Sequence, residues 1–244
     1  MKTSASLLLA CLGLLASCTI TDDEQAGLDE IQKIYGGQVS FKIGTVTSTK
    51  PTDVQGKVLE IDVKDADLTK YGDNLGLPAS KSALLMYRRM SAAEKTDYDG
   101  LQVVLQNGSS ARKFNFRMPV LARAERADGQ LKTLLDAWRQ HQYQTVANCW
   151  NQAALTGPNR AGLVEAVSRQ GEKIGPIAGF TPEGYIGFSS PVNGKPEELM
   201  NVFVTIAAPT GSSRQMLFCL NPRLAVGEQF LYGLAFLKPP FALQ

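Results

Sequence analysis

Histidine and acidic side chains are the residues of this sequence that could carry acid–base chemistry. The chain has a single histidine, His141, so any catalytic pair that uses histidine must include it. It lies at the rim of an apolar helical stripe, a position more typical of a helix-end or interface histidine than of a general base. Asp136 and Glu165 are the candidate carboxylates in the same half of the chain. A pocket enzyme of the hydrolase or isomerase type is therefore the alternative hypothesis for function.

Metal and phosphate chemistry lack their usual motifs. Residues 62–74 carry several aspartates, but Lys70 stands where a calcium loop needs its turn glycine. One histidine and no Cys-x-x-Cys pair cannot supply the ligands of a zinc site. Residues 75–82 have the form of a phosphate-binding loop, yet Ser80 replaces the glycine that precedes the lysine. We predict no cofactor and no metal site.

Aromatic side chains give a hint of ligand binding. Four of them come from predicted helices and from a glycine-rich passage, and they are Trp138, Tyr143, Trp150 and Tyr185. Aromatic residues at such positions either pack in the core or line an apolar pocket, where their polar tips orient a ligand. The sequence leaves both interpretations open, and these four residues are our pocket candidates.

The first residues have the layout of a secretory signal. Lys2 gives a positive start, and Leu7 to Leu15 form an apolar run far shorter than the roughly 20 residues that cross a bilayer as a helix. The run ends in Leu15-Ala16-Ser17-Cys18, which resembles the lipobox of bacterial lipoproteins. That resemblance implies recognition of Leu15, Ala16 and Ser17, cleavage before Cys18, and a lipid on the Cys18 sulfur.

The resemblance also implies a place in the cell. A chain with several acyl groups on Cys18 is held in a lipid bilayer of the cell envelope. Thr19 follows the cysteine in place of the aspartate that favours inner-membrane retention, so an outer membrane is expected. Residues 18–36 would form a polar tether with a short helix. Its acidic run, residues 22–24, is either a solvated tether or a signal for display on the cell surface.

Two cysteines remain in the mature chain, Cys149 and Cys219. Proteins outside the cytoplasm commonly form disulfides. We expect a bridge that closes a loop of about 70 residues, worth about 4 kcal/mol in the chain-entropy model. The alternative is a pair of buried free thiols.

The composition is that of an ordinary globular protein with a real core. Hydrophobic residues make up 44% and charged residues 20% of the 244 residues, and 25 basic side chains face 23 acidic ones. Because no long Lys/Arg cluster occurs, binding to nucleic acid has no electrostatic support.

Pattern and turn residues predict an α+β fold in two units. Residues 37–119 read as β-β-α-β-β, with strands at 37–49 and 56–65 and a hairpin at 100–118 around Asn107-Gly108. A helix is expected at 78–90.

The second unit spans residues 130–238 and follows residues 119–129, which are expected to be a linker or a short extra segment. A helix at 131–150 is expected to break near His141-Gln142, and Asn159 can cap a helix that runs to about Lys173. A short strand around Tyr185 to Phe188 and three strands, at 200–208, 214–220 and 228–237, complete the unit.

This order of helices and strands resembles the cone-shaped domains of the nuclear transport factor 2-like superfamily. The likeness lies in the Leu/Trp-rich first helix, Tyr143 after its turn, and the final alternating strands. It implies a bent sheet that wraps a helix and leaves a pocket, used for catalysis in some members and for binding in many. We therefore predict a membrane-anchored, non-catalytic module that binds a small ligand or a protein partner.

Overall fold

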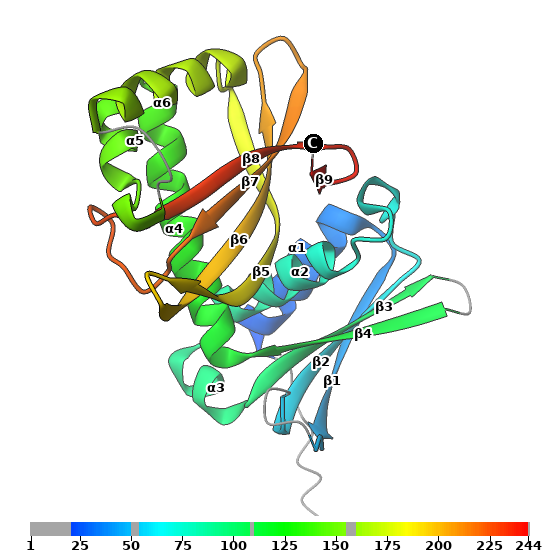
Figure 1. Ribbon diagram of the computed structural model, residues 1–244. Coiled ribbons are helices and arrows are strands. Elements are labelled where there is room, and N and C mark those ends of the chain that lie inside the picture. Colours follow the sequence, from blue (N-terminus) through cyan, green and yellow to red (C-terminus); the bar gives the residue numbers. More distant parts are fainter. Residues whose placement is uncertain (1–20, 50–53, 108–109, 155–159, 244) are drawn as a thin grey trace, which may run out of the picture.

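The computed structural model describes residues 21–49, 54–107, 110–154 and 160–243. The signal and lipobox residues, Asn159 and the hairpin turn residue Gly108 lie outside these ranges. The chain folds into the predicted α+β architecture, with one sheet in each half of the chain (Figure 1).

The first half forms sheet A in the predicted β-β-α-β-β order. Within the described residues its strands are β1 (Gln38–Val46), β2 (Gly56–Lys64), β3 (Gly100–Asn107) and β4 (Ser110–Arg117), adjacent in that order. The two hairpin pairs are antiparallel, whereas β2 and β3 are parallel. Parallel neighbours need a long crossover. It contains a short 3-10 turn, η1 (Thr69–Tyr71), and the helices α2 (Gly76–Arg89) and α3 (Ala92–Asp97).

Most of the expected tether is a folded helix, α1 (Asp22–Tyr35). Thr21 and Glu24 form a capping box, in which each side chain accepts a hydrogen bond from the backbone of the other. Leu28, Ile31 and Tyr35 follow Glu24 at helical spacing, and all four side chains are buried. The helix expected within residues 18–36 is therefore confirmed, although it packs against the core instead of remaining a solvated part of the tether. The acidic run forms the first helical turn, where negative charge complements the helix dipole.

The expected linker at 119–129 is also helical. β4 runs directly into α4 (Met118–Arg139), a helix of 22 residues. Pro119 is compatible with a first helical turn because that turn needs no N–H donor there. Leu121, Ala124 and Ala127 are buried, so a face that seemed polar in sequence packs against the core. A continuous helix thus joins the two halves.

The predicted break near His141 is confirmed. α4 ends at Arg139, His141 adopts a φ of 57°, and α5 (Tyr143–Cys149) follows. A short 3-10 turn, η2 (Gln152–Ala154), and α6 (Arg160–Ile174) complete the helices of this half.

Sheet B is an antiparallel meander in the second half. Within the described residues it contains β5 (Gly179–Val192), β6 (Lys195–Ala207), β7 (Ser213–Leu220), β8 (Leu231–Lys238) and the short β9 (Ala242–Leu243), in sequence order. The order of helices followed by antiparallel strands is as expected. The superfamily resemblance itself stays a prediction.

Helix α2 lies between the two sheets and packs against both (Figure 1). The buried side chains form one continuous cluster, from Leu28 in α1 to Phe241 after β8. The two halves therefore share one core. No helix within the described ranges is long and apolar enough to cross a membrane.

Candidate binding cleft

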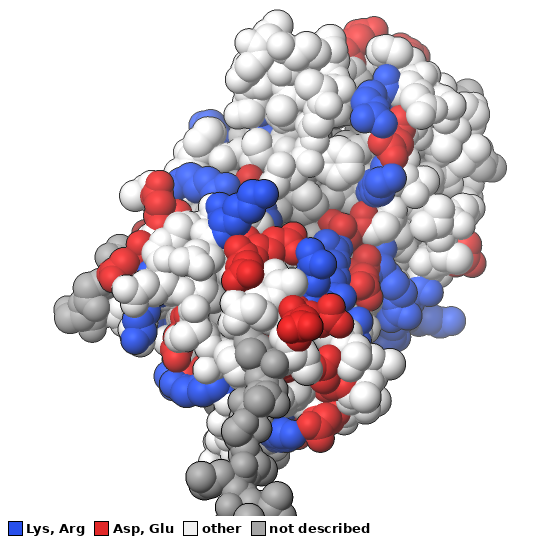
Figure 2. Space-filling model, turned by 180° about the vertical axis from the view of Figure 1, so that it is seen from behind, with Lys and Arg blue, Asp and Glu red and all other residues white. Residues whose placement is uncertain are grey.

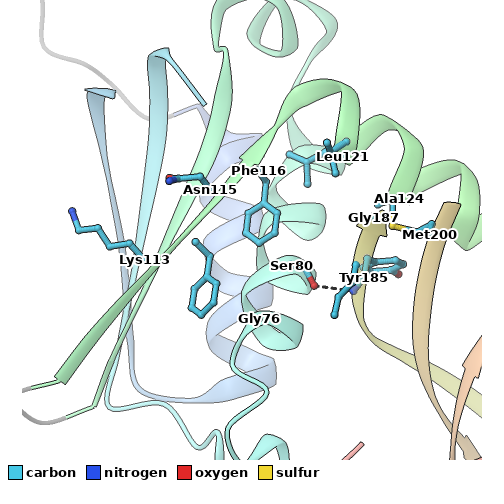
Figure 3. A pocket seen from close by; sticks show the side chains of 13 residues that line it. Gly76, Ser80, Lys113, Asn115, Phe116, Leu121, Ala124, Tyr185, Gly187 and Met200 are labelled. Carbon is cyan, nitrogen blue, oxygen red and sulfur yellow. Dashed lines mark hydrogen bonds between the residues drawn. The ribbon is translucent and has the colours of Figure 1, made fainter. Parts of the chain in front are cut away.

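A cleft of about 470 Å³ lies where the two halves meet. One wall is β4, the other is the middle of β5, and helices α2 and α4 supply the floor and one end (Figure 3). Its lining is mostly apolar, with few polar side chains: Gly76, Ser80, Lys113, Phe114, Asn115, Phe116, Val120, Leu121, Ala124, Tyr185, Ile186, Gly187 and Met200. This size and this mixture are typical of a ligand site.

The β4 wall is a strand edge. β4 is the last strand in the order of sheet A, so its outer side has no strand partner among the described residues. Phe116 points toward α2 and the cleft, whereas Lys113 and Asn115 point to the other face of the sheet (Figure 3). Phe114 also lies against α2, since a Cβ on Gly76 would be 3.8 Å from its Cε1. Residues from both faces of one strand can line the same cleft only if the cleft runs along the strand's edge. The backbone of β4 is therefore part of the wall.

The β5 wall has the same character. β5 is the first strand in the order of sheet B, and the consecutive residues Tyr185, Ile186 and Gly187 all line the cleft. Ile186 remains 46% exposed, which is high for an isoleucine in a strand. The cleft is thus bounded by two strand edges from different sheets, and neither edge has a strand partner in the described part of the chain.

The β5 wall is fixed to the floor by the backbone. The N–H of Tyr185 donates to the Ser80 Oγ at 2.8 Å, and that hydroxyl donates to the Leu77 carbonyl at 2.8 Å. Gly184 lies so close to α2 that a Cβ there would be 2.5 Å from the Leu77 Cα. The strand and the helix are therefore in direct backbone contact at this point.

The ring of Tyr185 is held by a polar chain that leads away from the cleft. Its hydroxyl donates to the Asp128 Oδ1 at 2.8 Å, and the Arg88 guanidinium donates to the Asp128 Oδ2 at 2.7 Å. Burial is the main cause that raises the pKa of Tyr185, so the hydroxyl keeps its proton at neutral pH. Of the four pocket candidates from the sequence, Tyr185 lines the cleft.

The other three candidates do not line the cleft, because they pack among the helices of the second half. Trp138 is buried, and a Cβ on Gly171 of α6 would lie 2.7 Å from both its Nε1 and the Cε1 of Tyr143. Trp150 packs on the core with its Nε1 buried and without a hydrogen-bond partner among the described residues. The described contacts of these three residues favour core packing over a place in the cleft.

The candidate acid–base residues also lie outside the cleft. His141 is exposed, and its Nδ1 lies 2.8 Å from the Tyr143 hydroxyl. Asp136 forms ion pairs with Lys132 and Arg139 on its own helix. The Glu165 side chain is 72% exposed and is 3.9 Å from the Arg169 guanidinium. No group of three or more His, Cys, Asp and Glu side chains in the described ranges could hold a metal ion.

Lys113 gives the cleft a basic rim, and two further basic residues of β4, Arg112 and Arg117, line neighbouring cavities. The strand carries Arg112, Lys113 and Arg117 and no acidic residue. Lys113 lies 3.7 Å from Glu60, while within the described part of the chain Arg112 and Arg117 form no ion pair. This strand edge is therefore positively charged along most of its length.

The expected disulfide is not formed, since Cys149 and Cys219 are both free thiols. The Cys149 Sγ donates to the Thr145 carbonyl within α5, at 3.3 Å. Cys219 alternates with Phe218 and Leu220 along β7, and these two neighbours belong to the buried core. Its thiol therefore faces the opposite side of the strand.

Both thiols are expected to resist alkylation in the native protein. Burial raises the pKa of Cys219 to about 11 and raises that of Cys149, so little reactive thiolate exists at pH 8. In denaturant without reductant, both should take up iodoacetamide, as read by peptide mass spectrometry. A protein that takes up label at these positions only after reduction would show that a bridge forms.

Comparison of the chain with protein-family models, with curated proteins and with solved structures finds no match. The geometry of the cleft is consequently the basis for a functional proposal.

Proposed function

We propose that this protein is a lipoprotein of the bacterial cell envelope, anchored through Cys18, that acts as a non-catalytic binding module. Its cleft would take an extended peptide segment of a partner protein. The observation that carries this proposal is that both walls of the cleft are strand edges without a strand partner among the described residues.

A peptide strand suits this cleft because of what an edge offers. Edge strands present N–H and C=O groups that can pair with an added strand about 4.8 Å away. Main-chain hydrogen bonds then supply affinity, and alternate side chains supply specificity. Side chains that point inward would meet Phe114, Phe116 and Leu121, which line the cleft. Those that point outward would lie beside Lys113 and Asn115.

Charge selects the partner. Arg112, Lys113 and Arg117 favour a peptide that alternates apolar and acidic residues. A second copy of the chain that paired β4 with β4 would bring two strands of three positive charges each together, which opposes self-association. The favoured occupant is therefore an acidic-apolar segment of a different protein.

The membrane anchor has support from the sequence and from the start of α1. Two residues separate Cys18 from Thr21, the capping residue of that helix. A lipid on Cys18 would thus hold the folded body close to an outer-membrane surface. The partner would be reached there or on the cell exterior.

Intact mass of the protein extracted from membranes tests the anchor. The expected mass is that of residues 18–244 plus acyl chains. An uncut chain, or a soluble product that begins at an unmodified Cys18, would contradict the proposed anchor.

Hydrogen exchange tests the peptide site in the purified protein. The probe is a capped hexapeptide that alternates valine and glutamate, and its binding should slow exchange of the β4 backbone amides. Lys113→Glu is expected to weaken binding about fivefold, or about 1 kcal/mol, because it reverses a rim charge. Lys195→Glu on the exposed β5–β6 turn makes the same charge change away from the cleft and should leave the affinity unchanged.

Two further peptides sharpen the outcome. A peptide that alternates valine and lysine should bind far more weakly, and a central proline should abolish binding because it removes a main-chain donor. If the β4 amides exchange at the same rate with and without the acidic peptide, the proposed occupant is wrong. If both charge variants weaken binding equally, the peptide binds through nonspecific attraction elsewhere.

A further inference from the structure

A second cavity, of about 350 Å³, lies between α1, α2, α4 and β5. Its charged lining includes Lys70, Lys81 and Arg88, and its apolar lining includes Leu84, Leu85 and Pro182. Basic and acidic side chains alternate near the middle of the rear face of the molecule (Figure 2). This cavity is distinct from the binding cleft, although Tyr185 contributes to both.

Lys81 is the unusual residue of this cavity. Its side chain is 11% exposed, and its Nζ lies 3.7 Å from the Glu183 Oε2, beyond hydrogen-bond distance. The same oxygen already accepts hydrogen bonds from Lys70 at 3.0 Å and from Tyr71 at 2.8 Å. Among the described residues, Glu183 is thus the carboxylate that pairs with Lys81, and it is too far away for a hydrogen bond and already accepts two others. An ammonium group has three donors, and their burial without acceptors is costly.

The charges around Lys81 leave one positive charge to be matched. The three cations Lys70, Lys81 and Arg88 face two carboxylates that contact them, Glu183 and Asp128. The acidic side chain of Glu30 also lines the cavity, but it pairs with Arg89 at 2.9 Å. A bound monoanion would balance the site, whereas a dianion would leave it negative.

The apolar part of the lining indicates what kind of molecule carries the anionic group. Leu84 and Leu85 come from the same helix as Lys81, and Ile34 of α1, which is 39% exposed, lies across from them. Apolar walls beside a single buried cation are typical of a site for an amphipathic small molecule.

We propose that this cavity binds a small organic monocarboxylate, with its carboxylate on the Lys81 Nζ and its apolar body against Leu84, Leu85 and Ile34. The Arg88 guanidinium, seven residues further along the same helix, provides a second donor. This site stands independently of the peptide cleft. Burial lowers the pKa of Lys81, and a bound carboxylate would raise it again.

Calorimetric titration of the full-length protein with sodium hexanoate tests this site. Hexanoate should bind saturably and in a 1:1 ratio, whereas neutral hexanamide should bind at least tenfold more weakly. Lys81→Met keeps the length of the side chain and removes its charge, so it should weaken hexanoate binding at least tenfold. Lys113→Met removes an exposed lysine from the binding cleft and should not change the affinity for hexanoate.

A second measurement uses the wild-type protein alone. Carbon-13 labelling of lysine side chains would follow the Lys81 Cε resonance, which should shift upon addition of hexanoate with the same affinity that calorimetry gives. Absence of saturable hexanoate binding to the wild type would overturn the proposal. Equal hexanoate binding by wild type and Lys81→Met would also overturn it. This outcome does not depend on whether the acidic peptide binds at β4.

Discussion

Replacing Glu183 with alanine is expected to lower the free energy of unfolding by about 3 kcal/mol. The Glu183 side chain is 5% exposed and accepts hydrogen bonds from Tyr71 and Lys70. Its loss would remove the carboxylate that accepts from the Tyr71 hydroxyl and would leave Lys81 without its nearby negative charge. Lys70 is 53% exposed and can regain water, which keeps the cost near the low end for a broken buried ion pair.

Urea unfolding of the variant and of a matched control would measure this effect. Glu165→Ala removes the same side chain from an exposed site, where its nearest cation is 3.9 Å away, and should change stability by less than about 0.5 kcal/mol. Equal effects of the two substitutions would contradict a structural role for the Glu183 network.

The stabilisation by Glu183 should depend on pH. Burial alone would raise its pKa, but the hydrogen bond from Lys70, the charge of Lys81 and the hydrogen bond from Tyr71 outweigh burial and lower it below 4.5. A lowered carboxyl pKa contributes stability that is full above the unfolded-state value of 4.5 and is lost as pH falls through the folded-state value. The stability difference between wild type and Glu183→Gln should therefore shrink when unfolding is measured at about pH 3 instead of pH 7. A constant difference would show that the charge of Glu183 is not the cause.

Local patterns were sufficient to predict most elements of this fold. The period-2 runs of the first sheet, the helix expected at 78–90 and the break at His141 each depend on residues close in sequence. The linker prediction for residues 119–129 failed because charged residues interrupt this segment. Its buried face consists of Leu121, Ala124 and Ala127, which do not form an obvious apolar stripe in the sequence. Tertiary packing decided this segment.

The sequence contains a turn signal for the long β5 strand that our predictions did not use. Pro182 and Pro191 argued against a strand, yet β5 is a sheet edge, where proline is tolerated. Asn193 and Gly194 both have positive φ and connect β5 to β6, so this pair is a hairpin turn of the kind that we recognised only at Asn107-Gly108.

The cleft could not be predicted from sequence. Phe114 and Phe116 alternate as in any half-buried strand, and nothing local indicates that their strand lies at an open edge. The opposite wall is contributed by Tyr185 and Ile186, about 70 residues further along the chain. The contact between Glu183 and Tyr71 likewise joins residues 112 positions apart. Such sites form only because α2 packs between the two sheets. The spacing of residues along the chain does not predict that packing.

Gly184→Ala is expected to destabilise the protein by about 3 kcal/mol, because it would separate sheet B from α2. A Cβ at this position would lie 2.5 Å from the Leu77 Cα and 2.6 Å from its carbonyl oxygen, both of which are backbone atoms that cannot rotate away. The contact sits beside the Tyr185–Ser80 hydrogen bond, so relief of the clash would also disturb the cleft wall. Thermal unfolding should show a fall in Tm of roughly 6 to 12 °C.

Gly187→Ala is the matched control on the same strand. A Cβ there would meet Met200 Cε at 3.6 Å and Val120 Cγ1 at 3.9 Å, which are ordinary contacts with side chains. This substitution should leave Tm nearly unchanged, since the loss of glycine freedom in the unfolded chain offsets any small packing cost. If the two variants unfold at the same temperature, β5 and α2 can move apart without cost. The walls of the cleft would then be adjustable, and the peptide site would have to form by induced fit around its occupant instead of being present beforehand.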